Sequence, residues 1–368
     1  MAEKMQIHLV AGARPNFIKV GPLYHALVKT HWANPTLVHT GQHFSADMSD
    51  IFFRDLGLPV PHYNLKASGG THAEQTASVL TAYESLCMLE RPDWVVVVGD
   101  INSTIAATLA AKKLNLKVAH LEAGLRSGDR TMPEEINRLL VDAIADLLWA
   151  PSEDAVSNLL KEGVAPQRIA LVGNIMIDAY CMLQERIAES STISRLNSAP
   201  FSYVLVTMHR PVNVDDHDIL SLVVDQIIDL SAIVPVVFPV HPRTRLRLES
   251  FGLIKKLYDA GVEILEPLGY IEFMNLVFNC RLVVTDSGGI QEETSYLGIP
   301  CLTARESTER PITLSLGSNR LISISCIAEA AKSVMESSGA RMKTSIPLWD
   351  GHTAERVVQS LFSQTVNR

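Results

Sequence analysis

Short apolar runs rich in β-branched residues alternate with helical stretches along most of this chain. Strand-like segments that alternate with helix-like segments are typical of a parallel sheet covered by helices on both faces. We therefore predict an α/β fold. The strand-like runs in the first half of the chain are residues 5–11, 36–40, 94–98, 118–121, 147–150 and 169–172.

A second series of such runs follows a Glu- and Ser-rich segment near residue 190. The chain has 368 residues, more than one ordinary compact domain holds. We predict two Rossmann-like domains with a cleft between them, residues 1–175 and 176–351, and a C-terminal helix at 352–368 that completes the first domain. The strand-like runs of the second half are residues 203–207, 234–240, 262–265, 282–285, 300–303 and 321–324.

One helix can be predicted in more detail. Residues 133–147 open with proline and two acidic residues, as helix N-termini often do. The apolar residues Ile136, Leu139, Leu140 and Ala143 recur at helical spacing. We therefore expect them to form the buried face of this helix.

The composition argues against several kinds of partner. The formal net charge is −8 and basic residues do not form runs, so nucleic acid is not an expected partner. No stretch approaches the ~18 apolar residues of a membrane span, and no signal-peptide pattern is present. The 5 cysteines include no C-x-x-C pair. We expect a cytoplasmic protein that does not enter membranes.

The first strand-like run leads into the segment GARPNFIK, with Arg14 on the turn and Lys19 one helical turn later. Cations at a helix N-terminus favour anion binding. Arg14 stands where a dinucleotide site needs glycine, and there is no G-x-G-x-x-G here, so a nicotinamide cofactor is not expected. The alternative is that both cations are ordinary surface charges.

The glycine turn DSGGIQEE is the most specific single signal. Ser287 is placed to cap a helix, and Gly288 and Gly289 would let backbone N–H groups approach a diphosphate. Glu293, about one turn later, would accept the hydroxyl groups of a ribose. A plain tight turn is the alternative. Asp286 would repel a phosphate, and the sequence gives no reason for its presence.

A second cationic loop follows the next strand-like run. Arg310 in the motif STERP would clamp a phosphate or a sugar hydroxyl with two nitrogen donors. The alternative is a solvated cluster of ion pairs made of Arg305, Glu306, Glu309 and Arg310.

Three carboxylates are candidates for acid–base chemistry. Asp100 and Glu122 each follow a strand-like run, and Glu134 begins the next helix. Carboxylates at neighbouring strand ends would crowd like charges, which prepares a group for proton transfer. Structural roles are the alternatives: Asp100 would cap a helix, Glu134 would complement a helix dipole, and Glu122 would pair with Arg126.

Histidines follow two strand-like runs of the second half. His209 and Arg210 come after one, and His241 after the next. A histidine at the carboxyl end of a parallel strand lies on the ligand side of the sheet, so His209 is a candidate functional residue and His241 a weaker one. The remaining histidines lack the spacing of a metal site, and no metal is expected.

These motifs occur together in one order. The chain resembles the non-hydrolysing UDP-N-acetylglucosamine 2-epimerases, whose fold is similar to that of the two-domain GT-B glycosyltransferases. The resemblance extends over nearly the whole chain and rests on the motifs GARPNFIK, VGDINST, HLEAGLRSGD, PEEINR, GNIMID, MHRPVN, DSGGIQEE and STERP.

The resemblance implies that UDP-N-acetylglucosamine and UDP-N-acetylmannosamine are interconverted by elimination of UDP and re-addition through 2-acetamidoglucal, with no redox cofactor. It also implies a homodimer that serves polysaccharide biosynthesis of the cell envelope. The implied catalytic residues are Asp100, Glu122, Glu134 and His209. The implied residues for the UDP-sugar are Arg14, Lys19, Phe273, Ser287, Gly288, Gly289, Glu293 and Arg310.

The chain departs from the family pattern at two places. Many bacterial members bind a second, activating substrate molecule partly through a Gln-His-x-Gln stretch, whereas here Gln42 and His43 are followed by Phe44 and Ser45. Leu268 stands where some members have glutamine, which would alter base or sugar contacts. Candidate residues for a second site or for the cleft are Gln42, His43, Arg210 and His241.

Other functions stay open. A related class acts on UDP-2,3-diacetamido-2,3-dideoxyglucuronate, and hydrolysing 2-epimerases release free N-acetylmannosamine and UDP from the same fold. A GT-B glycosyltransferase or a nucleotide-sugar binding module is a more distant alternative. Neither of these needs three carboxylates together with His209.

Overall fold

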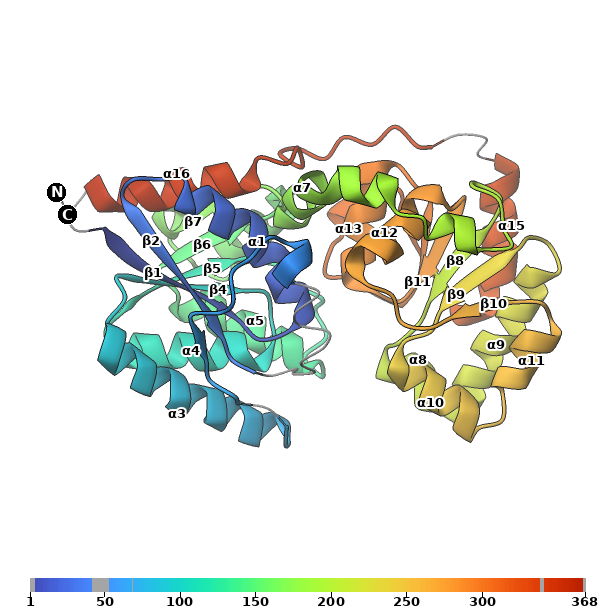
Figure 1. Cartoon of the computed structure of the whole chain (residues 1–368), viewed down its shortest axis with the longest axis horizontal. Helices are drawn as coiled ribbons and strands as arrows, with labels where there is room; N and C mark the ends of the chain where they lie inside the picture. Colours follow the sequence, from blue (N-terminus) through green and yellow to red (C-terminus); the bar gives the residue numbers. More distant parts are fainter. Residues whose placement is uncertain (1–3, 42–52, 68, 338–340, 367–368) are drawn as a thin grey trace. The chain divides into compact units, whose positions relative to one another are not determined.

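The computed structural model describes residues 4–41, 53–67, 69–337 and 341–366. The chain divides into two compact units (Figure 1). Unit 1 comprises Met1–Met182 and Pro347–Arg368, and unit 2 comprises Leu183–Ile346. The boundaries expected from the sequence were 175/176 and 351/352, whereas the structure divides the chain at 182/183, inside helix α7 (Ile175–Glu189), and at 346/347.

Unit 1 contains a parallel sheet with the strand order β3-β2-β1-β4-β5-β6-β7. The order reverses between β1 and β4, as in a Rossmann fold. The strands are β1 (Met5–Ala11), β2 (Ala33–His39), β3 (Tyr63–Asn64), β4 (Trp94–Val98), β5 (Lys117–Leu121), β6 (Leu147–Ala150) and β7 (Ile169–Leu171). Its helices include α1 (Arg14–Val28), α3 (His72–Glu90), α4 (Asn102–Lys113), α5 (Pro133–Ile144), α6 (Glu153–Lys161) and α16 (Thr353–Val366).

Unit 2 repeats this arrangement with the strand order β10-β9-β8-β11-β12-β13. All strand pairs are parallel, and the order reverses between β8 and β11. The strands are β8 (Val204–Thr207), β9 (Val236–Pro239), β10 (Glu263–Leu265), β11 (Leu282–Thr285), β12 (Cys301–Ala304) and β13 (Asn319–Ile322). The helices are α8 (Pro211–Val214), α9 (His217–Ser231), α10 (Pro242–Ser250), α11 (Ile254–Asp259), α12 (Tyr270–Asn279), α13 (Gly288–Leu297), α14 (Ile312–Ser315) and α15 (Ile327–Ser337).

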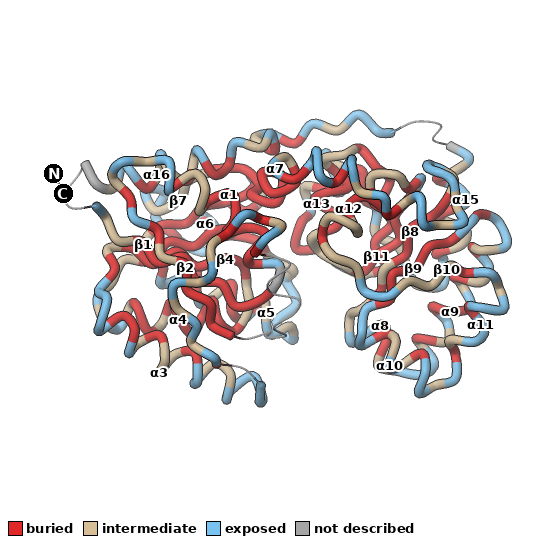
Figure 2. The backbone as a smooth tube through the Cα atoms, in the orientation of Figure 1, coloured by how far each residue is buried: buried red, intermediate tan, exposed pale blue. Residues whose placement is uncertain are grey.

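Burial explains why the central strands are continuous apolar runs. Every residue of β4, with the sequence WVVVV, is buried, and so is every residue of β11 (Figure 2). A strand in the middle of a parallel sheet is covered by helices on both faces, so neither set of alternating side chains reaches water. The predicted α/β fold with two Rossmann-like units is confirmed.

The C-terminal segment belongs to unit 1, where α16 packs against α1 (Figure 1). Trp349 donates from its indole nitrogen to the Pro151 carbonyl at 3.0 Å. Asp178 accepts from the Ala354 amide at 2.7 Å and so supplies an acceptor to the first turn of α16. These contacts attach α16, near the end of the chain, to unit 1, which also contains the first strand of the chain.

Helix α5 contradicts the predicted buried face. Ile136 and Leu140 are 46% and 50% exposed, and Ala143 is also exposed. The buried face instead carries the polar residues Glu135, Asn137, Arg138 and Asp142, together with Val141. The prediction was wrong because apolar spacing locates an amphipathic face without showing which face the protein interior needs. Here the interior contains a polar network.

Among the helices that the structure describes, none combines the length and the apolar character that crossing a membrane requires.

Candidate active site

In unit 1 the candidate residues follow three neighbouring strands. The chain leaves β1 towards Lys19, β4 towards Asp100, and β5 towards Glu122. Because β1, β4 and β5 are adjacent and parallel, their carboxyl ends lie along one edge of the sheet. This edge includes the point where the strand order reverses, which is where open parallel sheets bind ligands.

Lys19 and Glu122 form a buried ion pair at this edge. The ammonium group of Lys19 contacts Oε2 of Glu122. Gly99 packs beside the pair, since a Cβ atom added there would lie 3.5 Å from Glu122 Oε2 and 3.6 Å from Lys19 Nζ. Glu122 Oε1 is buried without a hydrogen-bond partner in the described part of the chain. One oxygen of this carboxylate is therefore held by a cation, and the other is not engaged.

Asp100 is held by residues of helix α5. Arg138 donates from Nε to Asp100 Oδ2 at 3.0 Å, and its Nη2 lies 2.9 Å from the same oxygen. Asn137 donates to the backbone oxygen of Asp100 at 2.8 Å. Glu135 in turn pairs with Arg138 and accepts from two amides of the loop before α5. The Asp100 side chain stays 33% exposed, so it is both anchored and accessible.

The structure does not contain the structural roles that were the alternatives for Asp100 and Glu122. Ile101, not Asp100, is the N-cap residue of α4. Arg126 pairs with Asp142 and Glu162 and not with Glu122. Asp100 and Glu122 each contact a cation of their own, in place of the uncompensated crowding of like charge that the sequence suggested.

The remaining candidates of unit 1 are less constrained. Glu134 is half-buried in the first turn of α5 and forms no ion pair with the residues that the structure describes. Arg14 is the first residue of α1, but its side chain lies outside the described part of the molecule. Gln42 and His43 also lie outside the described residues.

In unit 2, Asp286 organises the turn that carries His209. It accepts from the backbone amides of His209 and Arg210, at 3.0 and 2.8 Å, and from the Asn213 side chain at 3.0 Å. Its Oδ1 atom also lies 3.0 Å from His209 Nδ1. Burial alone would raise the pKa of Asp286, but these hydrogen bonds and the charge of His209 lower it. Asp286 is therefore an internal anion that fixes His209, which answers the question that the sequence left open.

The glycine turn serves two different purposes. A Cβ atom at Gly288 would lie 2.5 Å from Glu309 Oε1 and 2.6 Å from Arg310 Nη1, so this glycine makes room for the neighbouring loop. A Cβ atom at Gly289 would have no atom from other parts of the described chain within 4 Å, so there is open space beside the first turn of α13 at this position. Ser287 occupies the N-cap position, but its side chain makes no capping hydrogen bond, contrary to expectation.

Arg310 is built into a buried network of charges. Its Nη1 donates to Glu309 at 2.7 Å and its Nε lies 2.8 Å from Glu292. Arg305 lies 2.8 Å from the same Glu309. The cluster differs from the solvated one suggested by the sequence, because Glu292 takes the place of the exposed Glu306 and the four side chains are almost completely buried. Arg310 is thus rigidly placed beside Gly288.

Glu293 lies one turn inside α13 and is buried. The hydroxyl of Tyr270 donates to Glu293 Oε1 at 2.7 Å. Tyr270 begins helix α12, and Phe273 is half-buried one turn later on the same helix. The carboxylate expected to bind a ribose is therefore oriented by a residue from a different helix.

His241 and Arg210 lie beside His209. The rings of His209 and His241 are 5.4 Å apart between centroids. His241 is also the N-cap of α10, where its ring accepts from the Arg243 amide at 3.2 Å. Arg210 donates from Nε to the Asp286 carbonyl at 3.0 Å. The structure brings the three basic residues together at the carboxyl ends of β8 and β9.

The sequence analysis missed the residues that hold the candidates in place. They are buried polar side chains, most of which contact residues distant in sequence, and four of them form the polar face of α5 that the apolar spacing assigned to the surface. Asn16, for example, donates to the Val98 carbonyl at 2.9 Å and so ties the start of α1 to the end of β4. The missed residues are Asn16, His120, Glu135, Asn137, Arg138, Asp142 and Tyr270.

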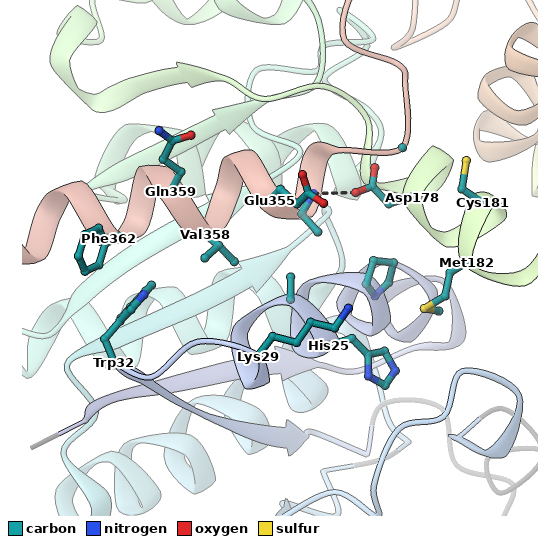
Figure 3. Close-up of a pocket in the computed structure, with 14 residues that line it drawn as sticks. His25, Lys29, Trp32, Asp178, Cys181, Met182, Glu355, Val358, Gln359 and Phe362 are labelled. Atoms are coloured by element: carbon teal, nitrogen blue, oxygen red, sulfur yellow. Dashed lines mark hydrogen bonds between the residues drawn. The ribbon is translucent and has the colours of Figure 1, made fainter.

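A cavity of about 490 Å³ lies elsewhere in unit 1, between α1, α7 and α16 (Figure 3). It contains none of the candidate site residues. Trp32 and Phe362 lie at one end of it, 5.3 Å apart between ring centroids. Asp178, which also lines it, is engaged with the Ala354 amide at the start of α16. We assign the site from the strand ends instead, because the charged and buried polar groups converge there.

Comparison with known proteins agrees with this geometry. The family model described as UDP-N-acetylglucosamine 2-epimerase matches residues 25–362. The UDP-N-acetylglucosamine 2-epimerase of Methanocaldococcus jannaschii is 42% identical over 366 residues, covering 97% of this chain and 99% of that protein. The UDP-2,3-diacetamido-2,3-dideoxy-D-glucuronate 2-epimerase of Pseudomonas aeruginosa is 40% identical and covers 86% of this chain and 88% of its own length.

Solved structures give the same relationship. The crystal structure of the Methanocaldococcus jannaschii UDP-GlcNAc 2-epimerase in complex with UDP-GlcNAc and UDP superposes with a TM-score of 0.90 at 41% identity. The match covers 98% of this chain and 100% of that one. Strand order, the ordered motifs and these matches lead to one conclusion. The chain belongs to the UDP-N-acetylglucosamine 2-epimerase family.

Proposed function

We propose that this protein is a non-hydrolysing UDP-N-acetylglucosamine 2-epimerase that interconverts UDP-N-acetylglucosamine and UDP-N-acetylmannosamine. Family membership supports the reaction class. The observation that carries the proposal is the pair of anchored carboxylates in unit 1, Asp100 held by Arg138 and Glu122 held by Lys19. A binding module or a glycosyltransferase has no need of two such groups at adjacent strand ends.

In the proposed reaction a carboxylate removes the proton from C2, the C1–O bond to UDP breaks, and a C1=C2 double bond forms. Re-addition of UDP and protonation of C2 from the opposite face give the epimer. Glu122, with one oxygen unengaged, and Asp100, with a partly exposed side chain, would transfer these protons. Glu134, which is half-buried at the start of α5, would be the third acid–base group.

Unit 2 would bind and release UDP. The N-terminus of α13 presents backbone N–H groups with open space at Gly289, which suits a diphosphate. Arg310 and Ser287 would contact the phosphates, and Glu293 the ribose. His209, oriented by Asp286, would stabilise the negative charge on the departing diphosphate. Lys19 of unit 1 would act near the sugar, Arg14 would help to hold the UDP-sugar, and Phe273 would lie near the uracil.

A second candidate is the epimerisation of UDP-2,3-diacetamido-2,3-dideoxyglucuronate. The 40% identity to the Pseudomonas aeruginosa enzyme favours it, since that value is close to the identity with the Methanocaldococcus jannaschii enzyme. The chemistry at C2 would be the same, so a direct comparison of the two substrates decides between them.

The test is incubation with UDP-N-acetylglucosamine in deuterated water without added cofactor, followed by proton NMR of C1 and C2. UDP-N-acetylmannosamine with deuterium at C2 supports the proposal. Free N-acetylmannosamine together with UDP would move the protein to the hydrolysing class. If neither product forms, the diacetamido uronate is the next substrate, and turnover of that compound alone would replace the proposal.

Variants test the assigned roles. Asp100→Asn, Glu122→Gln and His209→Ala should each lower kcat by about a hundredfold while UDP binding is kept. Arg310→Ala should weaken UDP binding as well as turnover. Glu185→Gln, on the exposed surface of α7, is the matched control and should behave as wild type. Wild-type turnover in a site variant would remove that residue from the catalytic set.

We further propose a homodimer, with the exposed apolar face of α5 as its contact. Ile136, Leu140 and Ile144 are 46%, 50% and 36% exposed on this one face. Apolar stripes of this kind are uncommon on monomer surfaces. Light scattering should give a dimer for the wild type and a monomer for Leu140→Asp. A monomeric wild type, or an unchanged dimer in the variant, would contradict this part of the proposal.

The cellular setting is part of the same proposal. All 5 cysteines are free thiols, as expected in a reducing compartment. The protein would therefore act in the cytoplasm, and its product would serve polysaccharide biosynthesis.

A further inference from the structure

The backbone that carries Glu122 is under strain. Glu122 has φ = 72°, a left-handed conformation that residues other than glycine rarely adopt. The residue before Asp100, Gly99, and the residue two after Glu122, Gly124, have positive φ as well. Strained backbone of this kind persists only where surrounding contacts enforce it. Specific contacts must therefore hold these two turns.

His120 provides one of them. It lies on β5, two residues before Glu122, and is fully buried. Its Nε2 lies 2.8 Å from the carbonyl oxygen of Gly99, and its Nδ1 lies 2.6 Å from Oδ1 of Asp142 on α5. A carbonyl oxygen can only accept a hydrogen bond, so Nε2 must carry a proton.

Asp142 provides the second contact. Its Oδ2 accepts from the Gly124 amide at 2.9 Å and lies 2.8 Å from Nη1 of Arg126. Burial alone would raise the pKa of Asp142, but His120, Arg126 and the Gly124 amide lower it. An ionised carboxylate only accepts, so His120 Nδ1 must also carry a proton. His120 and Asp142 therefore form a charged pair in the interior.

We infer that His120 and Asp142 are positioning residues, which together hold the two turns that present Asp100 and Glu122. His120 fixes the Gly99 carbonyl directly before Asp100. Asp142 fixes His120 on one side of Glu122 and the Gly124 amide on the other. One buried pair thus fixes the backbone conformation next to Asp100 and Glu122. Neither His120 nor Asp142 needs to touch the substrate for this. This inference rests on the proposed function for its kinetic consequence and on geometry alone for its existence.

The residues around the His120–Asp142 pair also hold it in place. Arg126 is itself held by Glu162 at 2.8 and 2.7 Å. Arg168 donates to backbone carbonyls at the end of α5, including that of Asp142 at 3.2 Å. A Cβ atom at Gly124 would lie 2.3 Å from the Ala155 carbonyl oxygen, so this turn also abuts α6. Charged side chains therefore hold this pair in place, and the turn at Gly124 is held by close packing against α6.

The kinetic test compares His120→Leu with His120→Gln. His120→Leu removes both hydrogen bonds and should lower kcat by about a hundredfold, the upper end of the loss seen when a residue that orients a site side chain is removed. KM and the Kd for UDP, measured by calorimetry, should stay within about threefold, because the proposed UDP contacts are in unit 2. His120→Gln keeps one donor for the Gly99 carbonyl, so its kcat should be about tenfold higher than that of His120→Leu. A folded His120→Leu protein with wild-type kcat, or equal losses in both variants, would overturn the inference.

A second measurement does not depend on activity. With ¹⁵N-labelled histidine, the His120 ring, assigned by its absence in His120→Gln, should show two protonated nitrogens at pH 7. In Asp142→Asn, the same ring should revert to one protonated nitrogen. A neutral ring in the wild type would refute the ion pair. If the wild type pairs as described but turns over no UDP-sugar, the proposed function fails and the ion pair stands.

Discussion

The Nδ1 atom of His209 lies 3.0 Å from Oδ1 of Asp286, whose side chain is fully buried. A carboxylate that accepts from Nδ1–H fixes both the orientation of the ring and its tautomer, so Nε2 is left to meet a ligand. The residue that looked like a repulsive neighbour of a phosphate is thus the partner of the histidine.

Replacement of Asp286 by Asn should lower kcat by about a hundredfold, because the histidine loses the partner that orients it. The affinity for UDP should change little, since the groups proposed to bind UDP remain. Steady-state kinetics and calorimetric titration of UDP measure the two effects. Asp215→Asn is the matched control, because Asp215 forms surface ion pairs with Arg243 and Arg247. Unchanged kcat in Asp286→Asn would show that His209 needs no such partner.

Lys19→Met should destabilise the protein by about 3 kcal/mol, because it leaves the buried Glu122 carboxylate without its cation. The double variant with Glu122→Gln should regain most of that stability but no activity. Urea denaturation of the wild type, both single variants and the double variant gives the four free energies of unfolding that a double-mutant cycle needs. Additive losses in the double variant would mean that the two side chains are not coupled.

The two adjacent glycines should respond differently to alanine. Gly288→Ala pushes a methyl group against Glu309 and Arg310, so it should weaken UDP binding about tenfold and also lower Tm. Gly289→Ala meets no atom of the protein, so it should keep Tm and affect only ligand binding. Calorimetry and thermal denaturation separate these outcomes. Equal Tm losses in the two variants would contradict the packing argument.

Tyr270→Phe should weaken UDP binding by about tenfold with little change in kcat. The variant removes the donor to the buried Glu293 carboxylate, and a hydrogen bond to a charged group contributes about 1.5–3 kcal/mol. Fluorescence or calorimetric titration of UDP measures the change. Tyr258→Phe, on the exposed surface of α11, is the control and should bind UDP as the wild type does.

The contribution of Asp142 to stability should disappear in acid. Its pKa is lowered in the folded state, so the stability it contributes is complete above the unfolded-state pKa of about 3.9. That contribution is lost as the pH falls from there through the lower folded-state value. The difference in unfolding free energy between wild type and Asp142→Asn should therefore shrink as the pH falls below about 4. A difference that does not change with pH would contradict the ionised state assigned to Asp142.

The architecture, and the candidate positions of the chemistry along the chain, could be predicted from the amino-acid sequence. The runs at β1, β4 and β6 have the predicted bounds because continuous apolar, β-branched stretches suit only strands buried on both faces. Residues after parallel strands share one edge of a sheet, so Asp100, Glu122 and His209 could be proposed before any coordinates were known.

The buried face of α5 and the residues that hold the candidate site could be identified only from the folded structure. The spacing of Ile136 and Leu140 is equally compatible with an inward and an outward face, and their 46% and 50% exposure follows from the polar network beneath α5. The pairs Lys19–Glu122, His120–Asp142 and His209–Asp286 join residues distant in sequence. A charged side chain in the interior is stable only beside a specific partner, and the fold alone brings those partners together.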